Sequence, residues 1–226
     1  MISEVVTKKN SQMLVALTPD WDSAQGTMQQ YERDEHGNWI AVSKRFPVVV
    51  GKNGLAWGRG LYRFDAIPAL QKKEGDGRSP AGVFALGEAF GFAPKEDAEW
   101  IRLLYAHITE KWECVDDAQS RHYNQLMERS AETDVDWNSS EKMLAVGEEY
   151  RWGIVVKHNM SPVENGCGSC IFLHIWQNEE TGTTGCTAME RANIETLLRW
   201  LDPAKNPVLV QLPESKAGVL DKMLGK

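Results

Sequence analysis

A histidine and a cysteine, twelve positions apart, are the residues of this sequence best suited to covalent chemistry. His174 lies in the apolar run 171–176, and Cys186 directly follows Gly185. Only the thiolate form of cysteine is a strong nucleophile, and a neighbouring histidine or a helix N-terminus lowers the pKa of the thiol. The pair could therefore carry out acyl transfer, in which the sulfur attacks a carbonyl carbon and the imidazole moves the proton.

The residues after Cys186 predict a helix over 188–201. Apolar residues recur there at helical spacing, at Ile194, Leu197, Leu198 and Leu201. Asp202 and Pro203 would end this helix. We therefore expect Cys186 at or just before the helix start, where free N–H groups and the helix dipole favour negative charge. With Gly185 allowing a tight turn, the same N–H groups could hold the oxyanion of a tetrahedral intermediate.

The run 171–176 reads as a buried strand, which would hold the His174 imidazole rigidly. A purely structural interpretation stands beside the catalytic one. Free cysteine is often an inert, buried, small hydrophobic residue, and a single histidine in an apolar run is often a core residue. The two interpretations differ in whether the Cys186 sulfur meets an accessible cavity.

The segment 171–189 resembles the signature of the L,D-transpeptidase catalytic (YkuD-like) family, which is a histidine, a variable loop and then Ser/Thr-x-Gly-Cys. The matching residues are His174, Thr183 or Thr184, Gly185 and Cys186. Residues 78–84 resemble the family's Thr/Ser-Pro-x-Gly-x-Phe motif, and residues 114–124 and 168–174 resemble segments of one proteobacterial branch. The resemblance extends over about residues 46–213.

This resemblance implies a fold that is mainly β with some α (α+β), built as a β-sandwich or mixed sheet with a short helix after the cysteine. It also implies cross-linking of bacterial peptidoglycan stem peptides through a Cys186 thioester, with release of a terminal D-Ala. By position, His174 is the base, the carbonyl of Ile175 orients its ring, and the amides of Gly185 and Cys186 form the oxyanion hole. Neither a metal nor an organic cofactor is expected.

Further residues are expected to bind substrate. By resemblance, Thr183 and Thr184 lie beside the nucleophile, and residues of the 114–124 segment line the stem-peptide cleft. That segment supplies Asp116, Asp117, Ser120, Tyr123 and Asn124. Many family members carry an arginine or asparagine two positions after the cysteine, where this chain has Ala188. We therefore expect Arg78, with its planar fork of donors, to bind a substrate carboxylate instead.

Two alternatives to cross-linking stay open at this point. Water could replace the amine as acceptor, which would make the protein an L,D-carboxypeptidase or L,D-endopeptidase of peptidoglycan. The chain could also be a non-catalytic module that binds peptidoglycan. The residue types at 174 and 186 do not separate these activities, because the difference lies in how the acceptor site excludes water and holds an amine.

We expect one domain over residues 1–226, with an N-terminal β extension at 1–45 and an inserted segment at 94–150 that forms a wall of the cleft. Alternation and turn residues predict the strands 13–17, 28–31, 39–43, 46–50 and 150–157. Charged and aromatic residues dominate the inserted segment, where we expect helical patches at 98–104 and 120–127. His158 is expected in a loop or at the surface.

Charge and hydropathy exclude other classes of protein. The net charge is −7 and no Lys/Arg cluster interrupts it, so nucleic-acid binding is not expected. No apolar run approaches the ~20 residues of a membrane-spanning helix. Residues 1–20 lack the pattern of a secretory signal. Because peptidoglycan lies outside the cytoplasm, we expect a periplasmic or other cell-envelope protein whose leader has been removed. The oligomeric state is not predicted.

Three further cysteines are Cys114, Cys167 and Cys170. The Cys-x-x-Cys pair is followed by a predicted strand rather than a helix, which argues against a thioredoxin-like site. A structural zinc would need four ligands, so we do not expect one. We expect Cys170 to pack inside its strand and Cys167 to pair with Cys114 in an oxidising compartment.

Overall fold

The computed structural model describes residues 6–7, 9–61 and 70–224. The strands are β1 (Gln12–Thr18), β2 (Gln25–Arg33), β3 (Trp39–Ala41), β4 (Phe46–Val49), β5 (Leu55–Trp57), β6 (Ser79–Gly91), β7 (Tyr105–His107), β8 (Trp112–Val115), β9 (Leu126–Glu128), β10 (Ser140–Lys142), β11 (Trp152–Val156), β12 (Phe172–Ile175), β13 (Thr187–Met189) and β14 (Val208–Pro213). The helical segments are η2 (Lys95–Ala98), η3 (Met143–Tyr150), α1 (Arg191–Trp200), η4 (Pro203–Lys205), η5 (Glu214–Lys216) and α2 (Ala217–Leu224).

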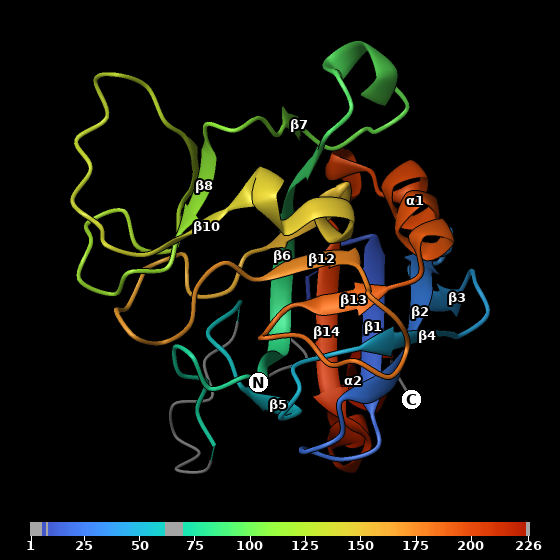
Figure 1. The fold of residues 1–226 in the computed structure, drawn as a ribbon. Coiled ribbons are helices and arrows are strands. Elements are labelled where there is room, and N and C mark those ends of the chain that lie inside the picture. Colours follow the sequence, from blue (N-terminus) through green and yellow to red (C-terminus); the bar gives the residue numbers. More distant parts are fainter. Residues whose placement is uncertain (1–5, 8, 62–69, 225–226) are drawn as a thin grey trace.

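Eight strands of the described residues form a closed sheet in the order β1-β14-β6-β11-β12-β13-β4-β2 (Figure 1). The sheet closes because β1 pairs on both sides, in parallel with β14 and antiparallel with β2. The expected class, mainly β with some α, is confirmed, whereas the β-sandwich was wrong. A sandwich would leave β1 or β2 as an edge, and closure removes that edge.

The expected N-terminal extension at 1–45 contributes β1 and β2 to this closed sheet, while β3 lies outside the ring and pairs with β2. The predicted strands at 13–17, 28–31, 46–50 and 150–157 correspond to β1, β2, β4 and β11. Short apolar runs between turn residues were sufficient to find them, and β1 and β11 are buried along almost their whole length.

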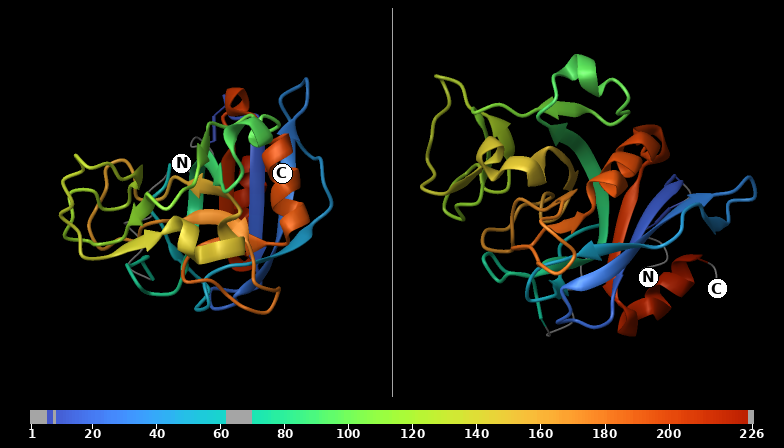
Figure 2. Two further views of the ribbon diagram at one scale, coloured as in Figure 1. Left: turned by 45° about the horizontal axis from the view of Figure 1, so that its top comes forward. Right: turned by 45° about the vertical axis from the view of Figure 1, so that its right-hand side comes forward.

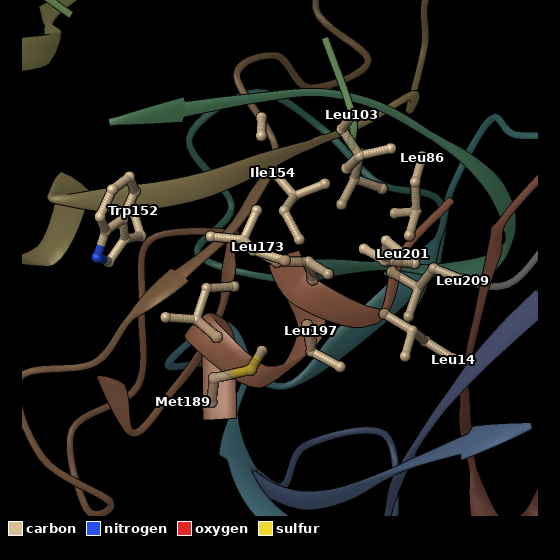
Figure 3. Packing of buried hydrophobic residues seen from close by; sticks show 14 of the residues in the cluster. Leu14, Leu86, Leu103, Trp152, Ile154, Leu173, Met189, Leu197, Leu201 and Leu209 are labelled. Carbon is tan, nitrogen blue, oxygen red and sulfur yellow. The ribbon is translucent and has the colours of Figure 1, made fainter. Parts of the chain in front are cut away.

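The main core packs between the strands and α1 (Figure 3). In that figure Leu14, Ile154, Leu173 and Leu209 lie around the helix, from which Leu197 points toward them. Helix α1 lacks a side-chain hydrogen bond at its N-cap residue. Its position therefore depends on packing, because full burial of each leucine contributes roughly 1.5–3 kcal/mol.

Two smaller clusters cover other faces of the sheet. Leu220 of α2 packs with Val210 and Leu212, which leaves every residue of β14 buried. The other cluster contains Phe90, Tyr150 and Phe172 and is separate from the core that packs on α1. The three aromatic rings meet edge to face. This aromatic cluster supports the strands that carry the candidate catalytic residues.

Within the segment 94–150, β7 pairs with β6 of the closed sheet, whereas β8, β9 and β10 form a separate sheet to one side of it (Figures 1 and 2). The helices predicted at 98–104 and 120–127 were wrong. The first range holds only the end of η2, and the second holds turns followed by β9. Asn124 explains the second error, because it takes a positive φ of 64° and its side chain donates to the carbonyls of His158 and Asn159.

The helices of the described residues are too short or too polar to span a bilayer.

Candidate active site

Cys186 lies at the start of a strand rather than at the start of a helix. The next residues form β13, which pairs in parallel with β12 and antiparallel with β4, and α1 begins only at Arg191. The predicted helix at 188–201 therefore started too early, and its dipole does not reach the sulfur. The helical periodicity of residues 194–201 was real, but pairing of Ala188 with Val49 in the sheet determines the conformation of the residues before it.

The two candidate catalytic side chains face the same side of the sheet. His174 pairs with Ala188 and Leu173 with Thr187 across β12 and β13. Because side chains alternate along a strand, Cys186 shares a face with Ala188 and His174. Both side chains contribute to the wall of one cavity of about 270 Å³, together with Glu141, Tyr150 and Trp176. This arrangement favours the catalytic interpretation over the purely structural one.

The His174 ring is held by the backbone of its own strand. Its Nδ1 donates to the carbonyl of Ile175 at 2.8 Å, as the resemblance implied. This bond leaves Nε2 as the nitrogen that can accept a proton. Burial lowers the pKa of His174 to about 4, although hydrogen bonds to the Ile175 and Glu149 carbonyls act in the opposite direction. The imidazole is therefore neutral near pH 7 and can act as a base.

The Cys186 sulfur has two hydrogen-bond partners in the described structure, since it accepts from the Phe172 N–H at 3.3 Å and donates to the Cys170 carbonyl at 3.4 Å. The phenol of Tyr150 lies in the wall of the same cavity and lowers the pKa of the thiol. Burial raises the pKa of the thiol to about 12, and the negative charge of Glu141 raises it further. In the free protein Cys186 is therefore a protonated thiol. The hydrogen bonds of its sulfur go to Phe172 and Cys170, and none goes to His174 in the described structure.

The backbone of Cys186 is fixed from two sides. Thr183 Oγ1 donates to its carbonyl at 2.6 Å, and Ser79 Oγ donates to the same carbonyl at 2.7 Å. Ser79 Oγ in turn accepts from the Gly51 N–H at 2.8 Å. Ser79 was not among the predicted site residues, although it lies in the Ser-Pro-x-Gly motif that carried part of the resemblance.

The predicted oxyanion hole is only partly free. The Gly185 N–H donates to Thr183 Oγ1 at 3.1 Å, so an oxyanion would have to compete with that hydroxyl. Thr184 is exposed and belongs to the cavity wall beside Cys186. Thr183 thus stabilises the backbone at the Cys186 carbonyl, whereas the exposed Thr184 is better placed to contact a ligand.

A second cavity of about 320 Å³ lies on another side of Cys186. Its wall includes Asp116, together with Lys72, Glu74 and Glu141, which the sequence analysis missed. Lys72 is buried, and its ammonium group pairs with Asp76 at 2.6 Å. These three missed residues had no recognisable spacing, because β10 and the 71–76 loop reach the cavity only through the tertiary fold.

Arg78 does not reach either cavity. Its guanidinium donates to the carbonyls of Trp21 and Leu55 at 3.0 and 2.9 Å, and it forms an ion pair with Asp22 at 2.7 Å. These contacts join the β1–β2 turn to the β5 strand. The structure therefore gives Arg78 a structural role, and the predicted carboxylate contact has no support from its position.

The predicted residues of the 114–124 segment divide into two groups. Asp116 lines the second cavity, whereas Ser120, Tyr123 and Asn124 are buried behind it. Tyr123 donates to Glu74 and accepts from the Gly168 N–H. The remaining residue, Asp117, accepts from the backbone of residues 119 and 138. Most of this segment thus supports the cavity wall from behind.

The disulfide joins Cys114 to Cys170, so the predicted pairing of Cys114 with Cys167 was wrong. Cys170 lies just before β12 with a positive φ of 53°, rather than inside the strand as expected. This turn brings its Cα to 5.9 Å from that of Cys114, while Cys167 keeps a free thiol. The bridge fastens β8 to the residues that precede His174.

His158 lies in the loop after β11, which was one of the two expected positions, but it is buried there rather than exposed at the surface. Its Nδ1 accepts from the Arg59 N–H at 3.2 Å, and its Nε2 donates to the Cys167 carbonyl at 2.9 Å. Burial lowers the pKa of His158 to about 3. Among the described residues, no group of His, Cys, Asp or Glu is arranged to hold a metal ion.

Comparison with known families gives one result that covers most of the chain. A model described as the L,D-transpeptidase catalytic domain (YkuD) matches residues 20–210. No curated protein matches the chain. The matched range contains all the residues of both cavities.

Proposed function

The chain belongs to the YkuD family of L,D-transpeptidase catalytic domains, and from this premise we propose that it cross-links peptidoglycan stem peptides through a thioester on Cys186. The family consists of cysteine-dependent enzymes that modify peptidoglycan. The observation that carries the proposal is the shared cavity of Cys186 and His174 on two adjacent parallel strands.

The reaction divides into two acyl transfers. The Cys186 thiolate attacks the carbonyl that precedes the terminal D-Ala of a tetrapeptide stem, a carbon–sulfur bond forms, and the amine of D-Ala leaves with a proton. An amine of a second stem then attacks the thioester and releases the sulfur. Each transfer needs a group that moves one proton, and His174 supplies it through Nε2 because the Ile175 carbonyl holds Nδ1.

Substrate binding has to change the protonation states of His174 and Cys186. The free protein pairs a neutral imidazole with a protonated thiol, since burial lowers the pKa of His174 and raises that of Cys186. A substrate that enters the cavity and draws the sulfur toward His174 would allow the proton to transfer. The tetrahedral oxyanion would then be held by the amides at Gly185 and Cys186 once Thr183 releases the Gly185 N–H.

Covalent labelling tests the nucleophile. The folded protein, with Cys167→Ser removing the other free thiol, is incubated with a carbapenem, which is an acylating mimic of the donor stem. We expect an intact-mass increase of one carbapenem, mapped to the peptide that contains Cys186 and absent in Cys186→Ala. A mass that stays unchanged in the folded Cys167→Ser protein would contradict the proposal.

The acceptor is tested with a purified disaccharide-tetrapeptide. Cross-linked dimers that require Cys186 would support transpeptidation. Tripeptides without dimers would instead identify an L,D-carboxypeptidase, and cleavage of pre-formed cross-linked dimers would identify an L,D-endopeptidase. Binding of the tetrapeptide that Cys186→Ala leaves intact, without turnover by the parent, would identify a peptidoglycan-binding module.

We also propose a location in the cell envelope, because the substrate of this reaction is assembled outside the cytoplasm. Immunodetection of the native protein in periplasmic and cytoplasmic fractions tests this location. Recovery in the cytoplasmic fraction alone would contradict it.

A further inference from the structure

Glu141 is an acidic side chain in the walls of both cavities that meet at Cys186. It lies on β10, directly opposite Cys114 on β8. The disulfide continues from Cys114 to Cys170, whose carbonyl accepts from the Cys186 sulfur. A continuous covalent and hydrogen-bonded path therefore fixes the position of this carboxylate relative to the nucleophile.

Tyr150 connects the carboxylate to the sulfur. Its ring is buried and packs edge to face on His174 and Phe172, with centroids 5.1 and 5.6 Å away. Its hydroxyl donates to Glu141 Oε2 at 2.8 Å, and it shares a cavity wall with Cys186, where the two groups influence each other's pKa. A phenol carries a single proton, so it can donate to Glu141 or to Cys186 but not to both at once.

The charges around this triad oppose two negative groups side by side. The negative charge of Glu141 raises the pKa of the Cys186 thiol, and Lys72 acts in the opposite direction. Burial raises the pKa of Glu141 to about 7, and the carboxylates of Asp116 and Glu74 contribute to this rise. Thiol and carboxyl are therefore coupled, because ionisation of either one disfavours ionisation of the other.

We propose that Glu141 is a positioning residue that sets the ionisation of Cys186 through the phenol of Tyr150. In this step the sulfur–hydrogen bond breaks and its proton passes to the Tyr150 oxygen, while the phenol's own proton moves to Glu141. Thiol and carboxylate become thiolate and carboxylic acid, with no change in net charge. The new O–H bond of Tyr150 then donates to the thiolate. In the free protein Glu141 thus determines how much thiolate is present, and during the proposed acyl transfer His174 takes this proton over through Nε2 and delivers it to the leaving amine.

The proposed proton transfer serves catalysis only if the proposed acyl transfer is right. The ionisation of Cys186 can nevertheless be measured without any peptidoglycan substrate. Iodoacetamide alkylates a thiolate directly and needs no peptidoglycan. The rate of Cys186 alkylation is measured between pH 6 and 9 in a Cys167→Ser background by quantifying the modified peptide. A flat rate above pH 7 without transpeptidation would contradict the proposed function alone.

The expected profile has a plateau. Below about pH 7 the parent's rate rises with pH, and above it the rate changes less than about twofold over one unit, because thiol–carboxylate and thiolate–acid carry the same number of protons. In Glu141→Gln the plateau disappears, and the rate rises about tenfold per pH unit throughout. Gln keeps a donor for the Tyr150 oxygen, so the phenol stays directed at the sulfur.

Two further variants test whether Glu141 acts on Cys186 through Tyr150. Tyr150→Phe removes the connection, so adding Glu141→Gln to it should change the rate much less than Glu141→Gln changes the parent. Glu148→Gln is the matched control, since its carboxylate pairs with Arg151 at 2.6 Å instead of with Tyr150. It should keep the parental plateau.

A Glu141→Gln profile that superimposes on the parental profile would overturn the proposal. If Glu141→Gln fails the circular-dichroism check of folding, Glu141→Asp replaces it. The shorter carboxylate withdraws from the Tyr150 hydroxyl, so this variant should also lose the plateau. A plateau retained in folded Glu141→Asp would equally overturn the assignment.

Discussion

Ser79 Oγ donates a 2.7 Å hydrogen bond to the carbonyl of Cys186, although 107 positions separate the two residues. The same oxygen accepts from the Gly51 N–H, so one buried hydroxyl joins the start of β6, the end of β4 and the nucleophile. This contact fixes the position of the sulfur at the mouth of the closed sheet.

Replacing Ser79 with alanine tests this contact. The Gly51 N–H loses its partner, and the Cys186 carbonyl retains only Thr183. We expect the free energy of unfolding to fall by about 1–3 kcal/mol and carbapenem acylation to slow. Urea denaturation and the labelling rate measure the two effects. Ser23→Ala, which removes only a local bond to Asp20, is the control, and an equal loss in both variants would contradict the assigned role.

Because Cys114 and Cys170 form a disulfide, we expect the free energy of unfolding to fall when a reducing agent is added. The disulfide closes a loop with a sequence separation of 56 residues, so its loss should cost roughly 2–4 kcal/mol. We expect a reducing agent to lower the urea midpoint of the parent and of Cys167→Ser, but not of a Cys114→Ser/Cys170→Ser double variant. Non-reducing peptide mapping should recover Cys114 and Cys170 in one species. Recovery of Cys114 with Cys167 would contradict the structure.

The loop before Cys186 has no room for a side chain at Gly182. A Cβ at this position would lie 2.6 Å from Lys52 Cα. It would push the loop away and weaken the paired bonds of Thr183 with Val50 and Lys52. We expect Gly182→Ala to slow acylation of Cys186 about tenfold or more. The control is Gly218→Ala, which enters open space on α2 and should leave the rate unchanged.

Two buried histidines predict loss of stability in acid. The pKa values of His158 and His174 fall to about 3 and about 4. From pH 6.5 down to about 4 the unfolded chain binds protons that the folded chain does not, so the free energy of unfolding decreases with falling pH. The slope reaches about 1.4 kcal/mol per pH unit for each histidine. Glu141 acts oppositely between pH 4.5 and 7, because its raised pKa favours the protonated folded form.

Urea denaturation at pH 7.5 and 5.0 measures this dependence. His158→Gln should narrow the difference between the two pH values, and the exposed His36→Gln should leave it as in the parent. Glu141→Gln should widen it, since the opposing contribution is removed. An unchanged difference in His158→Gln would show that this histidine is not buried as described.

The local patterns of the sequence predicted several of the strands and singled out His174 and Cys186, which share one cavity. The run 171–176 and residues 150–157 became β12 and β11 because their apolar residues are buried in the sheet. The signature of a histidine, a variable loop and Ser/Thr-x-Gly-Cys could be recognised because its residues lie within the short stretch 174–186. Their proximity in space, however, depends on the parallel pairing of β12 with β13.

Long-range contacts decided what the sequence analysis missed. Cys186 precedes a strand because Ala188 pairs with Val49, far away along the chain. Cys170, and not Cys167, bonds to Cys114 because a left-handed residue turns the chain before β12. Glu141 reaches the nucleophile only through the fold of the 94–150 segment. Spacing along the chain contains none of this information.

The position of β14 has a consequence for synthesis of the protein. This strand comes late in the chain, yet it lies between β1 and β6 in the closed sheet. The ribosome releases β1, β6 and the Cys186 strand before β14 is available, and domains fold as units. The nascent chain therefore carries Cys186 in an unfinished ring, and of the described strands β14 is the one whose insertion completes it.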